Sequence, residues 1–200
     1  MRVSSLVVPV LFLSLAATGC RNGESFSPFS FSGPIDSSDA VMGVVTDGDR
    51  TTVYVAGGPT TLETMTRWFE GDSTELATGI EAEGWIVSAT QNEAAIGQPL
   101  IGTLVSPQSQ SFAFSLATAT PGSVEGLYAA LDAGCLTGVV VRAGLPGQQP
   151  LLQGVWCSSS GSVEEVAPVV TPLALEDGAI TVTVAAPAGD REIQVRPYLP

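Results

Sequence analysis

The spacing of apolar and polar residues predicts short β-strands along most of the chain. Residues 110–117 alternate most regularly, with Phe112, Phe114 and Leu116 on one face of an extended strand and serine and alanine on the other. A strand of this kind buries one face and exposes the other. Similar runs bounded by glycine, proline or aspartate predict further strands at residues 41–46, 51–56, 74–79, 84–90, 98–105, 126–131, 135–142, 150–157, 163–170, 179–185 and 191–197.

The turn residues between these runs favour antiparallel pairing of neighbouring strands. Asp47-Gly48 joins the first two runs, and Asp177-Gly178 precedes the last two. Because the connections are short, we expect an all-β fold in which residues 41–131 form an antiparallel meander, a small β-barrel or sandwich of about eight strands. Residues 132–200 are expected to add a disulfide-linked antiparallel hairpin region, packed with the meander as one unit.

Residues 61–70 fit two structures. Thr60 and Glu63 have the spacing of a helix capping box, and Gly71 could end such a helix. The threonines and aromatic residues favour an extended chain instead, and strands are predicted on both sides. We therefore expect a strand over residues 63–70, with a helix as the alternative.

Composition and charge narrow the possible functions. The 200 residues include 20 acidic and 7 basic residues, which gives a net charge of −13. All seven basic residues are arginine, and there is no lysine or histidine. A chain this acidic repels phosphate backbones, which argues against nucleic acid as a partner. Without histidine or lysine, the Ser-His and Ser-Lys arrangements of common hydrolases cannot form. The sequence predicts no cofactor and no enzymatic activity.

Cys135 and Cys157 are predicted to form a disulfide. The strands around them form a hairpin centred near Pro146, which places the two thiols opposite each other. A bridge across a loop of this length would stabilise the fold by about 3 kcal/mol. A zinc site is not expected, because two cysteines without histidine do not supply its ligands.

Four aromatic residues are candidates for ligand binding. Trp68, Trp85, Tyr54 and Tyr128 could form an exposed platform for a sugar or a peptide. A different possibility is a barrel that encloses a small apolar ligand. Its interior would be lined by Val53, Val55, Leu100, Leu104, Phe112, Phe114 and Leu116.

Acidic residues offer two further possibilities. Glu81 with Glu83, or Glu164 with Glu165, could act as the paired carboxylates of a glycosidase. Oxygen ligands for calcium could come from Asp47 and Asp49, joined by Asp36 and Asp39, but aspartate and glycine also suit a plain hairpin turn. We expect solvated acidic side chains in the first case and a turn in the second.

The N-terminus has the features of an export signal. Arg2 precedes an uncharged apolar run, residues 6–17, that is too short to span a bilayer. The small residues Ala17, Thr18 and Gly19 before Cys20 resemble the lipobox of bacterial lipoprotein precursors. The alternative is a plain secretory signal, cut after Ala16 or Gly19.

The lipobox resemblance implies that residues 1–19 are removed and that Cys20 carries a diacylglycerol and an N-acyl chain such as palmitate. Pairing of the other two cysteines leaves Cys20 free for this role. Arg21 is not the aspartate that retains such proteins in the inner membrane, which implies the outer membrane in a diderm host and otherwise the outer face of the cell membrane. Residues 20–40, rich in serine, proline and phenylalanine, are expected to be a tether. Docking of Phe26, Phe29 and Phe31 onto the domain or the membrane is the alternative.

The expected function is therefore that of a lipid-anchored cell-envelope protein, a non-enzymatic structural or binding module with an envelope protein or a glycan as possible partner. The alternatives are the small-ligand carrier and, after it, the glycosidase. The order of residues 53–57, 67–71, 102–107 and 126–130 also resembles exported bacterial proteins built from β-hairpins. That resemblance implies no activity.

Overall fold

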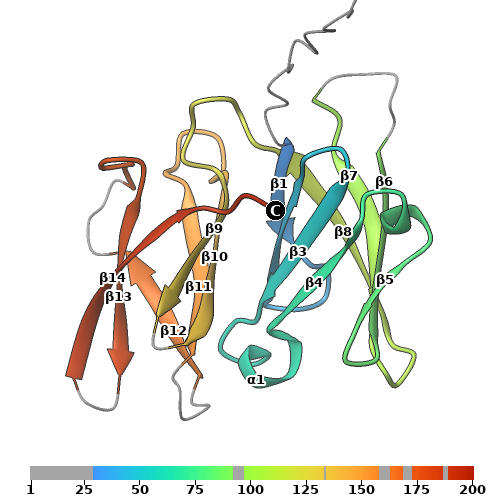
Figure 1. Ribbon diagram of the computed structural model, residues 1–200, viewed down its shortest axis with the longest axis horizontal. Coiled ribbons are helices and arrows are strands. Elements are labelled where there is room, and N and C mark those ends of the chain that lie inside the picture. The colour runs from blue at the N-terminus through green and yellow to red at the C-terminus, as the bar shows by residue number, and fades with distance from the viewer. Residues whose placement is uncertain (1–28, 92–96, 133, 158–162, 169–172, 187–188) are drawn as a thin grey trace, which may run out of the picture.

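The structure, a computed structural model, describes residues 29–91, 97–132, 134–157, 163–168, 173–186 and 189–200. The described chain is all-β and antiparallel, as the alternation of apolar and polar residues predicts. Its strands form two units that lie side by side (Figure 1). Within the described residues, no helix is long and apolar enough to span a membrane.

The first unit is an eight-stranded sheet that curls into a nearly closed barrel. Its order is β4-β3-β2-β1-β8-β7-β6-β5, so β4 and β5 form the two edges. Large side chains from all parts of the sheet, among them Phe31, Phe69 and Phe114, form one core inside it. The strands are β1 (Phe29–Pro34), β2 (Val41–Thr46), β3 (Arg50–Ala56), β4 (Arg67–Asp72), β5 (Ile80–Ala82), β6 (Trp85–Gln91), β7 (Leu100–Val105) and β8 (Ser111–Thr118).

The second unit is a closed six-stranded barrel in the order β10-β11-β12-β13-β14-β9. Tyr128, Val139 and Trp156 belong to its core. Its strands are β9 (Gly126–Asp132), β10 (Cys135–Arg142), β11 (Leu151–Cys157), β12 (Val163–Pro168), β13 (Ile180–Ala186) and β14 (Gly189–Pro197).

The two units share a third core at their junction, where β2 and β3 face β9 and β10 (Figure 1). Alternate residues of β2 and β3 point into the first barrel, and the residues between them meet the second unit. These strands are therefore apolar on both faces, which explains why they lack alternation. The buried residues of this junction are Val41, Val45, Tyr54, Ala56, Leu127 and Val140.

Hydrogen bonds also join the two units. The side-chain amide of Gln153, on β11, donates to the backbone oxygens of Asp39 at 2.9 Å and Ala56 at 3.0 Å. Both acceptors belong to the first unit. The second unit is thus attached by polar contacts as well as by apolar burial.

Several sequence predictions are corrected by the structure. The tether predicted over residues 20–40 contains β1, which pairs with both β2 and β8. Phe31 enters the core, as the docking alternative anticipates, because Phe29-Ser30-Phe31 alternates like a strand. The run at 126–131 does not close the meander, since it becomes β9 of the second barrel.

Two local predictions also change. The strand predicted at 63–70 is a short helix, α1 (Leu62–Met65), followed by β4, and the strand predicted at 74–79 contains a 3₁₀-helix, Glu75–Ala77. Neither helix has a side-chain hydrogen bond at its N-cap. The capping box suggested by Thr60 does not form, because that hydroxyl donates to Asp39.

Candidate functional site

The four candidate aromatic residues do not form an exposed platform. Tyr54 and Trp68 lie at the junction of the two units, Trp85 lies inside the first barrel, and Tyr128 lies inside the second. Trp68 is half-buried, and the other three are buried. The prediction of one aromatic binding surface is therefore wrong.

Tyr54 is the central aromatic residue of the junction. Its ring centroid lies 4.3 Å from that of Trp68, which in turn lies 5.3 Å from that of Tyr198 near the C-terminus. Burial raises the pKa of the Tyr54 phenol well above its ordinary value. The buried phenol oxygen has no hydrogen-bond partner among the described residues. These contacts give Tyr54 a packing role.

Trp85 takes part in closing the first barrel. The guanidinium of Arg67, on edge strand β4, lies 4.5 Å from the centroid of the Trp85 ring on β6. Arg67 also donates to the backbone oxygens of Thr64 and Met65, at the C-terminal end of α1, and its Nη1 lies 3.4 Å from a carboxylate oxygen of Glu83. Burial lowers the pKa of Arg67, and the charge of Glu83 opposes that shift. Arg67 thus connects the two edges of the curled sheet.

Tyr128 is a core residue of the closed barrel. Its hydroxyl donates to the backbone oxygen of Val124 at 2.9 Å. Burial raises the pKa of the Tyr128 phenol to about 12. With its hydroxyl bonded internally, Tyr128 is not available to a ligand.

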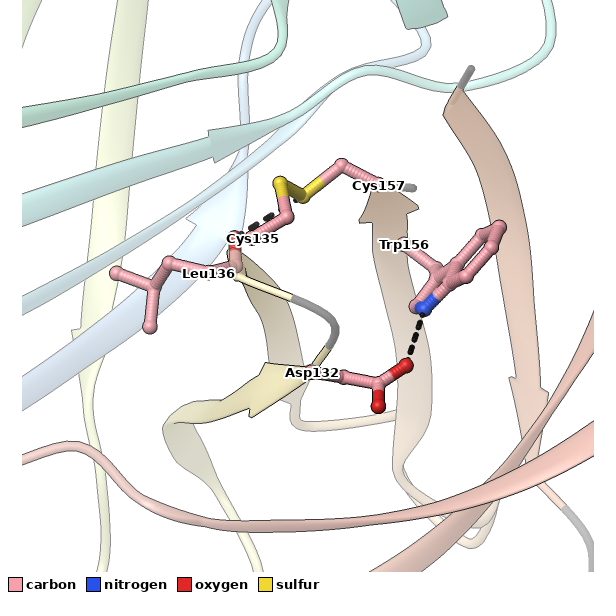
Figure 2. Close-up of a disulfide and its surroundings, with 5 residues drawn as sticks. All are labelled: Asp132, Cys135, Leu136, Trp156 and Cys157. Atoms are coloured by element: carbon pink, nitrogen blue, oxygen red, sulfur yellow. Dashed lines mark hydrogen bonds between the residues drawn. A yellow bond between two sulfur atoms is a disulfide. The ribbon is translucent and has the colours of Figure 1, made fainter. Parts of the chain in front are cut away.

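The predicted disulfide between Cys135 and Cys157 is present, with 5.8 Å between the two Cα atoms. It joins the beginning of β10 to the end of β11 (Figure 2). The register of the hairpin differs by one residue from the predicted one, because Gly138 pairs with Val155. The bridge therefore forms between residues that are not direct partners.

A polar cluster lies beside the disulfide. Asp132, at the end of β9, accepts a hydrogen bond from the indole N–H of Trp156 at 3.0 Å (Figure 2). Its second carboxylate oxygen lies 2.7 Å from a guanidinium nitrogen of Arg191 on β14. Asp132 thus ties β9, β11 and β14 together, a role that the sequence gives no signal for.

The calcium candidates serve as turn residues. The side chain of Asp47 accepts hydrogen bonds from the backbone N–H groups of Asp49 and Arg50, which lower the pKa of its carboxyl. Asp36, in the turn after β1, donates its backbone N–H to Ala113. Among the residues described, no group of three or more histidine, cysteine, aspartate or glutamate side chains could hold a metal ion.

Asp39 has a structural role that sequence reasoning missed. Its carboxylate accepts hydrogen bonds from the backbone N–H and hydroxyl of Thr60, each at 2.6 Å, and from the hydroxyl of Thr61. Burial would raise the pKa of this carboxyl, but the hydrogen bonds outweigh that effect and lower it from 3.8 to about 2. Asp39 holds the β1–β2 turn against the segment that leads into α1.

The two candidate glutamate pairs lie in different units of the fold. Glu81 is on β5, and Glu83 occupies the turn after it with a φ of 52°, where it pairs with Arg67. Glu164 and Glu165 are on β12 of the other unit, paired with β11. Adjacent strand residues point to opposite faces, so Glu164 and Glu165 do not converge.

The interiors of both units are filled by side chains. The side chains predicted to line a barrel cavity, such as Val53, Leu104 and Phe114, pack against one another in the first core. In the closed barrel, a β-carbon on Gly154 would meet methyl groups of Val139 and Val166 at 2.7 Å. A pocket beside the start of β13 has a volume of about 30 Å³, room for a few water molecules. A carrier would need several hundred cubic ångströms.

Cys20, the residue predicted to carry lipid, lies outside the described residues, as does Phe26. Comparison of the chain with protein-family models, with curated proteins and with solved structures finds no match.

Proposed function

We propose that the protein is a lipid-anchored component of a bacterial cell envelope, whose β-domain acts as a non-enzymatic structural or binding module. The observation that carries the proposal is the use of cysteine. Two of the three cysteines form the disulfide, and Cys20, the third, follows the small residues at the end of an export signal. Disulfides form in oxidising compartments outside the cytoplasm, which agrees with export.

The distance between Cys20 and the domain also fits an anchor. β1 begins at Phe29, nine residues after Cys20. Diacylglycerol together with an N-acyl chain gives stable membrane attachment where a single chain would not. The membrane is therefore the first partner that we assign to the protein.

The described surface supports a module rather than an enzyme. The chain lacks histidine and lysine, Asp39 and Asp132 hold the fold together, Glu83 pairs with Arg67, and Glu164 and Glu165 point to opposite faces of β12. The filled interiors weigh against the carrier. An envelope protein or a glycan is the partner that we propose for the domain.

A cysteine variant tests the anchor. Cys20→Ser should lose label from radioactive palmitate and move from the membrane fraction to the soluble fraction. The double variant Cys135→Ser/Cys157→Ser removes the disulfide and should stay labelled and membrane-bound. If the Cys20→Ser protein remained labelled and in the membrane fraction, the proposal would be wrong.

A further inference from the structure

One end of the molecule gathers the start of the described chain and several loops. The backbone oxygen of Ser30, the second residue of β1, accepts a hydrogen bond at 2.8 Å from the backbone N–H of Ala119, which comes just after β8. A β-carbon on Gly126, the first residue of β9, would meet the Ser30 hydroxyl at 3.0 Å. Gly126 pairs with Val141 at the end of β10. The β10–β11 loop therefore leaves the molecule at the end where β1 begins (Figure 1).

This end exposes several large apolar side chains, among them Phe29 and Leu145. Phe29 is 51% exposed at the beginning of β1, and Leu145 is 67% exposed in the β10–β11 loop. The loop, residues 143–150, contains no charged residue. Exposed apolar side chains are common on proteins, so exposure alone does not indicate a binding surface. What distinguishes Phe29 and Leu145 is that they lie at the end of the domain to which the proposed anchor is attached.

The tether keeps one end of the domain close to the anchor. The nine peptide steps from Cys20 to Phe29 reach about 15–18 Å on average as a flexible chain, although they could span at most about 30 Å when fully extended. Strands of seven to eight residues, such as β8 and β9, make the units roughly 25 Å long. The end at which β1 begins is therefore the end nearest to an anchor on Cys20.

We propose that this end, with Phe29 and Leu145 as its apolar contacts, rests on the surface of the membrane. The proposal rests on the proposed lipid anchor. Two apolar side chains bind a bilayer weakly, but the tether keeps them at a high effective concentration beside it. A contact that is negligible for a free protein can then fix the orientation of an anchored one.

The charges of this end indicate which lipid it accepts. Asp47 and Asp49 lie in the β2–β3 turn, and Arg50 follows them. This turn is at the same end of the molecule because Thr46, the last residue of β2, pairs with Phe29. Arg142 ends β10, and Glu125 precedes β9. Together with Asp72, the β4 partner of Arg50, these residues carry more negative than positive charge, which gives no attraction to anionic lipid. We assign the contact to zwitterionic phospholipid.

Tryptophan scanning tests the orientation. Phe29→Trp and Leu145→Trp place an indole at the end nearest the anchor, and Leu131→Trp places one at the opposite end of β9, where the leucine is 77% exposed. Each lipidated protein is incorporated into phosphatidylcholine vesicles with and without brominated acyl chains. Bromine quenches an indole only at close range, and the unsubstituted protein gives the background of the native tryptophans.

The expected result is quenching of the added emission in Phe29→Trp and Leu145→Trp and none in Leu131→Trp. Equal quenching at both ends, quenching at residue 131 alone, or no quenching would overturn the proposal. Replacing phosphatidylcholine partly by phosphatidylglycerol should weaken the quenching, and stronger quenching would contradict the assignment to zwitterionic lipid.

Failure of the anchor itself is recognised separately. If the intact mass shows no acyl chains, the proposed function fails, and the contact is then tested by coupling the Cys20 thiol to a maleimide phospholipid in the same vesicles. Because Cys135 and Cys157 are joined to each other, Cys20 is the one thiol left for coupling.

Discussion

The ring of Tyr54 lies against the backbone of Gly138, in space that a side chain on residue 138 would need. A β-carbon there would overlap the Tyr54 ring and would come within 2.7 Å of the Trp68 ring. Gly138 is on β10 and the two aromatic residues are on β3 and β4, so this contact joins the two units. The junction therefore requires a glycine at position 138.

Gly138→Ala should destabilise the protein by about 1–3 kcal/mol, because overpacking forces rings or backbone to move. The measurement is unfolding by urea. In a Tyr54→Leu background the same substitution should cost less, since the obstructing ring is gone. An equal cost in both backgrounds would contradict the contact.

Arg67→Met should lower the free energy of unfolding by about 2 kcal/mol. The variant loses the stacking on Trp85 and the hydrogen bonds to the end of α1. Glu83→Gln is the matched control and should cost less than about 1 kcal/mol, because the Glu83 side chain is 79% exposed. If the two variants were equally stable, Arg67 would not connect the edges of the sheet.

Asp39 should make stability depend on pH in acid. Its carboxyl has a pKa of about 2 in the folded protein against 3.8 ordinarily, so the folded state favours the charged form. The stabilisation is present above pH 3.8 and is lost as the pH falls toward 2. Asp39→Asn should cost about 1–2 kcal/mol at neutral pH and remove this part of the dependence.

The control for Asp39 is Asp36→Asn, which changes an exposed carboxylate in the same turn. Urea unfolding between pH 2 and pH 5 should give curves of the same shape for the native protein and this control. A native protein whose stability falls no more steeply than that of Asp39→Asn would argue against the role of the Thr60 and Thr61 hydrogen bonds.

Reduction of the disulfide should lower stability by about 3 kcal/mol, because 22 residues separate its cysteines along the chain. The loss should appear first in the second barrel, where Trp156 reports unfolding through its fluorescence. Cys20→Ser should leave the unfolding curve unchanged. An unfolding curve insensitive to reductant would mean that the bridge does not restrain the hairpin.

Local patterns in the sequence predicted most of the fold. The Asp47-Gly48 turn and the alternation around Phe114 identify strands and hairpins because both depend on neighbouring residues alone. The choice of partner for β9 depends on long-range packing, which its sequence does not record. β1 is rich in serine, so its sequence favours a tether over a strand, although one of its phenylalanines enters the core.

The candidate aromatic residues show the limit of such reasoning at sites. The residues next to Tyr54 and Trp85 in the sequence do not show whether these side chains are exposed or buried, and the structure buries both. One signal was present: Val41–Val45 and Val53–Ala56 are apolar without alternation, as strands covered on both faces are. That pattern identifies the junction, and Tyr54 lies within it.

The most direct test of the proposed anchor is the intact mass of the protein purified from the membrane of its own cells, with and without reductant. We expect a chain that begins at Cys20, carries acyl chains, and gains the mass of two hydrogen atoms on reduction of Cys135–Cys157. A chain of unlipidated mass, cut elsewhere or with a free Cys20 thiol, would contradict the anchor and the localisation inferred from it.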